Sequence, residues 1–183
     1  MSENAESPTR EEKVSGVLRK KGIEIEDKSS IDSLSQRGFG TSENNTFTLT
    51  FYEALYLADK TLLEVRDKHS REVDFQHLLR CYEAVNENAW VSYLVYRDLR
   101  SRGYVVREGF GLGTDFRVYE RGAYGKDISQ YLVLSIQEGQ PLPILNLVSA
   151  LHQCQSQKKD LVLAVMNRRG EVVHYSVSPL KFS

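Results

Sequence analysis

The sequence predicts an α+β protein, in which a small N-terminal mixed α/β domain precedes a C-terminal domain with a mixed sheet flanked by helices. Three observations lead to this prediction. Of the 183 residues, 40% are hydrophobic, which is enough for a packed core. Segments that alternate apolar and polar residues, typical of strands, are interspersed with segments whose apolar residues recur at helical spacing. The periodicity breaks at residues 86–88 (Asn-Glu-Asn), where a domain boundary is expected.

The N-terminal domain is expected to cover residues 11–86, after a polar, disordered arm of residues 1–10. Val14, Val17 and Leu18 give the charged start of this domain a weak apolar face. The other predicted elements follow in chain order: a strand at 23–26, a helix at 30–36 that ends before Gly38, a strand at 46–50, a helix at 51–63, a hairpin of 64–66 and 72–73, and a helix at 75–82.

The C-terminal domain, residues 87–183, is expected to open with an amphipathic helix over residues 93–102. Gly103 then suits the left-handed position that ends many helices. Gly109, Gly111 and Gly113 are expected to bracket a loop. A helix at 142–157 is expected to pack on a single sheet, whose strands are predicted at 104–107, 115–119, 131–136, 161–166 and 172–177.

Composition limits the classes of function. The formal net charge is −1, so an RNA-binding surface would have to be a local patch. Cys81 and Cys154 lie far apart without zinc-ligand spacing, so we expect buried reduced thiols rather than a disulfide or a metal site, and no cofactor. The sequence has no signal peptide and no apolar run of about 18 residues. A soluble, cytoplasmic protein without a membrane segment is therefore expected.

Three stretches carry a family resemblance. Residues 96–122 read YRDLRSRGYVVREGFGLGTDFRVYERG, residues 158–177 read KKDLVLAVMNRRGEVVHYSV, and residues 51–60 read FYEALYLADK. Together they resemble the archaeal tRNA-splicing endonucleases, the tRNA-intron endonuclease family, over residues 46–182. This resemblance implies a restriction-endonuclease-like fold for the C-terminal domain. It also implies metal-independent cleavage of pre-tRNA at the intron boundaries, which leaves 2′,3′-cyclic phosphate and 5′-hydroxyl ends.

Such cleavage needs a base for the 2′-hydroxyl, an acid for the leaving 5′-oxygen, and positive charge near the transition state. In the family these roles belong to a Tyr, a His and a Lys. The Tyr matches Tyr119 and the Lys matches Lys159, with Lys158 in the preceding basic position. Two alternatives stay open: Tyr119 is a half-buried packing residue, and the lysine pair interacts with a helix dipole.

The family histidine is replaced in this chain. Its position, three residues before the Tyr-Leu-Val strand, holds Ile128, which cannot transfer a proton. The adjacent Asp127, if exposed, is ionised at pH 7 and would be a poor acid. Losing a general acid typically costs roughly 100- to 10,000-fold in rate. His152 marks a second departure, because the family has an Arg there that stacks on a bulged RNA base, and a neutral imidazole does not replace a guanidinium.

The resemblance further implies assembly with a paralogous endonuclease subunit, as a hetero-oligomeric tetramer that binds pre-tRNA with a bulge-helix-bulge. An apolar strand near the end of the chain predicts a subunit interface, because an unpaired strand of this kind is a hazard. Its apolar residues are Val173, Tyr175 and Val177. The preceding loop contains Arg168 and Arg169, where the family's non-cutting subunits carry an acidic loop, so its charge is reversed.

Three interpretations follow from these residues. In the first, the chain is a structural subunit, and a paralogous chain supplies the complete triad. In the second, it is a catalytic subunit that takes its acid from Asp127 or from a partner chain. In the third, it is an RNA-binding scaffold that has left splicing.

Overall fold

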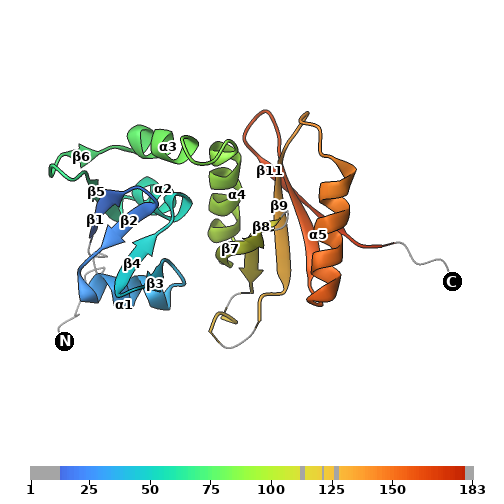
Figure 1. Ribbon diagram of the computed structural model, residues 1–183, viewed down its shortest axis with the longest axis horizontal. Coiled ribbons are helices and arrows are strands. Elements are labelled where there is room, and N and C mark those ends of the chain that lie inside the picture. The colour runs from blue at the N-terminus through green and yellow to red at the C-terminus, as the bar shows by residue number, and fades with distance from the viewer. Residues whose placement is uncertain (1–12, 112–113, 121, 126–127, 180–183) are drawn as a thin grey trace, which may run out of the picture.

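The computed structural model describes residues 13–179 except 112–113, 121 and 126–127, so the predicted arm of residues 1–10 lies outside it. Figure 1 shows two sheets separated by helices. The N-terminal sheet lies at one end and α4 stands in the middle. The second sheet follows, with α5 on its far side. The α+β class and the order of the two domains are as the sequence predicted.

The N-terminal half contains a sheet of strand order β3-β4-β2-β1-β5-β6 and three helices. Strands β1 and β5 run parallel, and the other neighbouring pairs are antiparallel. The elements are β1 (Val14–Arg19), β2 (Gly22–Ile25), α1 (Lys28–Gln36), β3 (Thr41–Glu43), β4 (Thr46–Leu49), α2 (Phe51–Asp59), β5 (Leu63–Arg66), β6 (Glu72–Val73) and α3 (Phe75–Glu83).

Local side chains explain where these helices start. The Asp27 carboxylate accepts a hydrogen bond from the Ser30 amide at 2.8 Å, and Asp74 accepts one from the His77 amide at 2.7 Å. Both contacts satisfy amides that have no partner within the first helical turn. Helix α2 begins with a capping box, in which Glu53 accepts from the Thr50 amide at 2.9 Å.

In this half, one predicted helix end is wrong and two strands were not predicted. The helix predicted over 51–63 ends at Asp59, because Thr61 has a φ of 59° and the Leu62 amide turns back to the Leu57 carbonyl. Leu63 instead starts β5, where it pairs with Val14. The weak apolar face at the start of the domain belongs to strand β1, and β3 was not predicted.

The C-terminal half is a sheet of strand order β11-β10-β9-β8-β7 between two helices. Strands β9 and β10 are parallel, and the other pairs are antiparallel, so the sheet is mixed as predicted. The elements are α4 (Ala89–Ser101), β7 (Val105–Gly111), β8 (Thr114–Tyr119), β9 (Tyr131–Gln137), α5 (Ile144–Ser156), β10 (Asp160–Met166) and β11 (Val172–Val177).

The glycines near the β7–β8 hairpin do not all bracket a loop. Strand β7 continues through Gly109 to Gly111, with a register shift between Glu108 and Gly111. A Cβ at Gly109 would lie 2.3 Å from the Thr114 carbonyl oxygen, so the close approach of the partner strand requires glycine. Gly113 lies outside the described residues. Gly103 has a φ of 88° and ends α4, as predicted.

A single apolar core crosses from one half to the other. Tyr52 of α2 lies with its ring centroid 4.8 Å from that of Tyr96 of α4, and 5.2 Å from that of Phe116 of β8. All three side chains are buried. A smaller second core joins α5 to the opposite sheet face through Leu132, Ala150, Cys154 and Leu161. The two halves are therefore packed together through α2 and α4.

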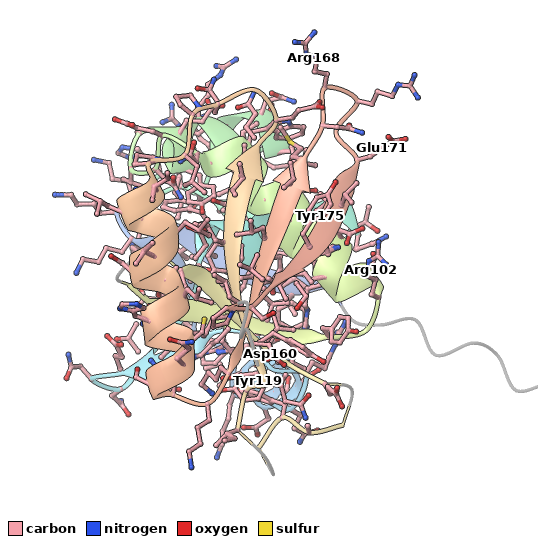
Figure 2. The ribbon with its side chains drawn as sticks, turned by 90° about the vertical axis from the view of Figure 1, so that its right-hand side faces the viewer. Arg102, Tyr119, Asp160, Arg168, Glu171 and Tyr175 are labelled. Atoms are coloured by element: carbon pink, nitrogen blue, oxygen red, sulfur yellow. The ribbon has the colours of Figure 1, made fainter. Side chains whose placement is uncertain are left out.

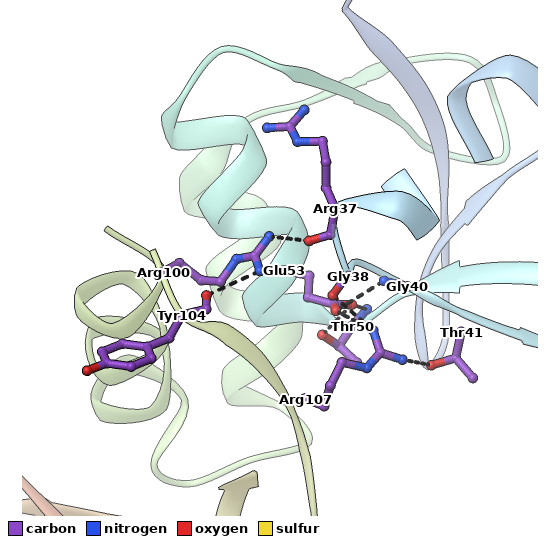
Figure 3. A network of polar contacts seen from close by, with 9 residues as sticks. All are labelled: Arg37, Gly38, Gly40, Thr41, Thr50, Glu53, Arg100, Tyr104 and Arg107. Atoms are coloured by element: carbon purple, nitrogen blue, oxygen red, sulfur yellow. Dashed lines mark hydrogen bonds and ion pairs between the residues drawn. The ribbon is translucent and has the colours of Figure 1, made fainter. Parts of the chain in front are cut away.

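A buried ion pair also joins the two halves (Figure 3). The Arg107 guanidinium of β7 lies 3.3 Å from a Glu53 carboxylate oxygen, and the Glu53 side chain is 2% exposed. Burial raises the pKa of Glu53, and the charge of Arg107 partly opposes that rise. Arg107 also donates to the Gly38 carbonyl at 3.3 Å and to the Thr41 hydroxyl at 2.8 Å.

A second arginine, Arg100, also contacts this N-terminal segment. Arg100 of α4 donates to the Arg37 carbonyl at 3.0 Å (Figure 3). Its guanidinium also lies 3.8 Å from the centroid of the Phe39 ring. The other terminal nitrogen of the Arg100 guanidinium, Nη1, donates to the Tyr104 carbonyl at 3.4 Å. We call residues 37–41 the domain strap, because C-terminal side chains hold this N-terminal segment from two directions. None of the described helices is long and apolar enough to span a membrane.

Candidate functional site

The strand directions bring three sequence-predicted positions to one end of the C-terminal sheet. Strand β8 ends where β9 begins, and β10 begins beside β9, because β8–β9 is antiparallel and β9–β10 is parallel. Tyr119 and Asp160 lie at this end in Figure 2. The Gln130 amide donates to the Val118 carbonyl at 3.1 Å, and the Asp160 amide donates to the Gln130 carbonyl at 3.0 Å. We call Tyr119, residues 128–130 and Lys159 the site edge.

Tyr119 is the last residue of β8 and is half-buried. Its ring meets Tyr124 edge to face, with centroids 5.2 Å apart and an interplanar angle of 87°. This contact agrees with the packing interpretation of Tyr119, and the residue still lies at the end of the sheet where the other site positions are. Both alternatives for its role therefore stay predictions.

Lys159 is aimed by the turn that ends α5. Lys158 has a φ of 54°, and the Lys159 amide donates back to the Cys154 carbonyl at 2.9 Å, a left-handed helix end that is usually occupied by glycine. The Lys159 ammonium donates to the Ser129 carbonyl and, at 2.8 Å, to the Ser129 hydroxyl. Lys159 thus bonds to the loop before β9, whereas Lys158 is exposed.

The surroundings of Lys159 favour loss of its proton. Burial lowers the pKa of its ammonium, and the positive charge of Arg117 lowers it further. Lys159 is also hydrogen-bonded to Ser129, which is 3% exposed. A cation held in this way suits the stabilisation of a negatively charged phosphorane, because its position is set before the reaction.

Ile128 lies directly before Ser129 and is 73% exposed. An isoleucine there neither fills the core nor transfers a proton, and its aliphatic side chain faces solvent. Asp127, the alternative acid, lies outside the described residues. The described part of the site edge therefore presents a phenol and an ammonium, and the position between them in the expected triad is apolar.

His152 lies on the exposed side of α5, about two helical turns before Lys159. Ala150 and Cys154 on the same helix point into the second core. The expected RNA-binding positions His152 and Lys158 thus lie at the surface, and whether they contact RNA stays a prediction. Among the described residues, no three His, Cys, Asp or Glu side chains form a group that could hold a metal ion.

The predicted interface residues lie on β11, at an edge of the sheet. Val173 and Tyr175 are 45% and 54% exposed, whereas Val177 is partly buried against the second core. Ile144 and Leu145 at the start of α5 add exposed apolar surface at 76% and 77%. Neither residue was predicted, because the sequence does not show which apolar residues of this helix face the sheet.

Arg168 and Arg169 occupy the β10–β11 turn and are exposed. Asn167 shapes this turn, since its side-chain oxygen accepts from the Arg169 amide at 2.8 Å and from the Glu171 amide at 3.0 Å. Figure 2 shows Arg168 at the end of the sheet opposite Tyr119. The two predicted regions, site edge and turn, are therefore far apart on the molecule.

Two contacts at the site edge have no counterpart among the sequence predictions. Ser129 receives Lys159, and Tyr124 receives the Tyr119 ring. Ser129 directly follows Ile128, so the sequence motif gives the position of Ser129. The motif does not show that Ser129 binds Lys159. Tyr124 stands in a glycine-flanked segment with no periodicity, and nothing in the sequence pairs it with Tyr119.

Two family models match most of the chain. The N-terminal domain of tRNA intron endonucleases matches residues 14–79, and their catalytic C-terminal domain matches residues 89–175. A tRNA-splicing endonuclease of Methanococcus vannielii is 36% identical over 159 residues, covering 87% of this chain and 90% of the relative. The tRNA-splicing endonuclease of Pyrococcus furiosus is 35% identical over 146 residues, covering 80% and 84%. That of Pyrococcus horikoshii is 32% identical over 148 residues, covering 81% and 85%.

Proposed function

Since the chain belongs to the tRNA intron endonuclease family, we propose that it is the structural subunit of a heteromeric tRNA-splicing endonuclease. A paralogous subunit with a complete triad cuts the pre-tRNA at its bulge-helix-bulge and leaves 2′,3′-cyclic phosphate and 5′-hydroxyl ends. One observation carries the proposal: the histidine position is Ile128, which is 73% exposed beside the Ser129 that binds Lys159.

The proposed division of labour follows from the chemistry. A phenol can act on the 2′-hydroxyl and an ammonium can stabilise the phosphorane, but the 5′-oxygen leaves poorly without a proton. The family relatives are named tRNA-splicing endonucleases. We infer that this chain keeps the fold and the assembly surfaces, while proton transfer belongs to the partner.

A second candidate is a catalytic subunit that takes its acid from Asp127 or from a partner chain. The lowered pKa of Lys159 and its hydrogen bonds to Ser129 favour this candidate. Neither feature is expected of a lysine that only packs at the surface. No observation at the site edge specifically favours the third candidate, an RNA-binding scaffold outside splicing.

The deciding experiment is a cleavage assay on an intron-containing pre-tRNA. We expect no useful cleavage by the purified chain, and cleavage when it is mixed with a paralogue that retains the histidine. Tyr119→Phe in this chain should leave the mixture's rate unchanged, because the partner supplies the triad. Robust cleavage by the isolated chain, abolished by Tyr119→Phe, would refute the structural role and establish the catalytic one.

We propose the apolar surface of β11 and the start of α5 as the contact with the partner subunit. Val173 and Tyr175 expose apolar area on β11, whose outer edge pairs with no other described strand. Ile144 and Leu145 expose further apolar area at the start of α5. Such an edge invites pairing with another chain. Pairing along β11 would cover the strand, and the α5 residues would add apolar burial beside it.

The interface is tested by a double variant, Val173→Lys with Tyr175→Lys. We expect it to elute as a monomer where the parent assembles, because two charges would be buried without partners. Ser176→Lys is the matched control, since Ser176 is exposed on the same strand but on its other face. Deleting residues 175–183 should give monomers or aggregates. An unchanged oligomer in the double variant, by light scattering, would place the interface elsewhere.

A further inference from the structure

We propose that Tyr124 is a positioning residue for Tyr119, and that the N-terminal domain sets the place of Tyr124 through Gly38. The domain strap would then act on the site edge, although no residue of the strap belongs to it. The inference rests on the proposed function only for the role of Tyr119 in cleavage; the chain of contacts stands without it.

The first link joins the two tyrosine rings. Tyr119 is the last residue of β8, where it pairs with Val105 of β7. Beyond the strand end, other atoms must limit the rotation of its ring. Tyr124 supplies them, with its ring perpendicular to that of Tyr119 at a centroid distance of 5.2 Å. Edge-to-face pairs of this kind are geometrically selective. The hydroxyl of Tyr119 is therefore directed partly by where Tyr124 lies.

The second link joins Tyr124 to the N-terminal domain. A Cβ at Gly38 would lie 3.3 Å from two carbon atoms of the Tyr124 ring and 2.5 Å from a methyl group of Val105. The Tyr124 ring thus lies close to Gly38, and the nearest obstacle to a methyl group there is Val105, which pairs with Tyr119 on the neighbouring strand. Gly38 also has a φ of 73°, which disfavours any side chain.

The third link makes the strap a fixed support. Arg107 donates to the Gly38 carbonyl and Arg100 to the Arg37 carbonyl, at 3.3 and 3.0 Å. On the other side, the Gly40 amide donates to the buried Glu53 carboxylate at 3.1 Å. Because residues on both sides of Gly38 are hydrogen-bonded, the backbone of Gly38 is held in place. It can therefore act as a fixed support for the Tyr124 ring.

A purely structural role for Tyr124 and a positioning role lead to different expected results. If the ring only fills space, its loss lowers stability and shifts the ¹⁹F resonance of residue 119 by removing a ring current, but the Tyr119 ring keeps one orientation. If it positions Tyr119, its loss also lets the Tyr119 ring adopt several orientations, which broadens or splits that resonance. We therefore measure that phenol directly, with 3-fluorotyrosine incorporated at position 119 and ¹⁹F NMR of the folded full-length chain.

Three variants and one control define the test. Tyr124→Ala and Gly38→Ala should each broaden or split the ¹⁹F resonance of residue 119, and Tyr124→Phe should leave a single resonance of parental width because the ring contact is kept. Gly139→Ala is the control: its φ is 82°, close to that of Gly38, but a Cβ there meets no described atom within 4 Å. It carries similar backbone strain without the contact.

A single resonance of parental width in Tyr124→Ala overturns the proposal, and so does a broadening in Tyr124→Phe as large as that in Tyr124→Ala. If Gly38→Ala fails to fold, the alanine and phenylalanine variants of Tyr124 still decide the first link. Fluorotyrosine at 124 in a protein with Gly38→Ala and Val105→Ala then tests the second, because the methyl group that a Cβ would meet at 2.5 Å is removed. A Gly38 substitution that folds and changes neither resonance limits the support to Tyr124 alone and overturns the role of the N-terminal domain.

A second readout separates this inference from the proposed function. In a chain given an acid by Ile128→His, Tyr124→Ala should lower kcat by up to about 100-fold, as a misplacement near 1 Å does, with KM little changed. Tyr124→Phe should retain the rate. If the Tyr119 resonance broadens or splits but cleavage never depends on Tyr119, the positioning stands and the assignment of Tyr119 to cleavage fails.

Discussion

Replacing Ile128 by histidine is expected to give the isolated chain a metal-independent cleavage of pre-tRNA, at most roughly 100- to 10,000-fold above the parent, the usual worth of a general acid. The side chain is 73% exposed, so an imidazole fits without disturbing the core. An exposed histidine has a pKa near 6.5, in the range where an acid works at neutral pH. Lys159 is already bonded to the next residue, Ser129.

Adding His152→Arg should raise the rate further, because a guanidinium can stack on a base as an imidazole cannot. The two changes are expected to act more than additively, since they serve one site. The measurement is the rate of cleavage with analysis of the ends, which should be cyclic phosphate and 5′-hydroxyl. Tyr119→Phe in the double variant is the control and should abolish the gain.

The double variant also tests the site edge as a whole. If it folds, binds RNA and cuts no faster than the parent, then Tyr119 and Lys159 are packing residues in this chain. The pairing of the sequence motif with these positions would then be wrong, and the interpretation as a scaffold would gain.

Arg107→Ala is expected to lower the free energy of unfolding by about 3–5 kcal/mol, because it leaves the Glu53 carboxylate buried and without its cation. Glu53 is 2% exposed and lies 3.3 Å from Arg107. The substitution also frees the carbonyl of Gly38 and the hydroxyl of Thr41. Urea unfolding at pH 7 measures the loss. Arg19→Ala, which breaks an exposed pair with Glu24, should cost about 1 kcal/mol or less.

The loss in Arg107→Ala should depend on pH in a defined direction. Burial already raises the pKa of Glu53 above its unfolded value near 4.3, and removing Arg107 raises it further. A carboxyl whose folded pKa is raised stabilises the fold below the unfolded pKa, and that contribution disappears as the pH rises through the folded pKa. The deficit should therefore shrink as the pH falls from 7 toward about 4.5. A deficit that stays constant would show that Glu53 keeps its charge in the variant.

Much of the candidate site could be predicted from the sequence, because its motif is local. Tyr119 follows its Gly-Thr-Asp-Phe strand by a constant number of residues, and Ile128 and Lys159 are placed in the same way from the strands that follow them. These positions lie at the same end of the sheet because β8 and β9 are antiparallel while β9 and β10 are parallel. Strand direction is set by the crossover connection and the core, which no single stretch encodes.

The sequence alone determined the features that depend on neighbours within a few residues. Asp27 and Asp74 cap helices with amides three residues away, and Gly103 ends a helix because it lacks a side chain. The tertiary structure decided the features that need partners far along the chain. Leu63 is a strand residue because Val14 pairs with it, 49 positions earlier in the sequence. Glu53 and Arg107 meet across 54 positions, and Gly38 meets Tyr124 only after both halves have packed. Contacts of this kind depend on the common core, so their physical cause is the burial of apolar surface by the whole chain.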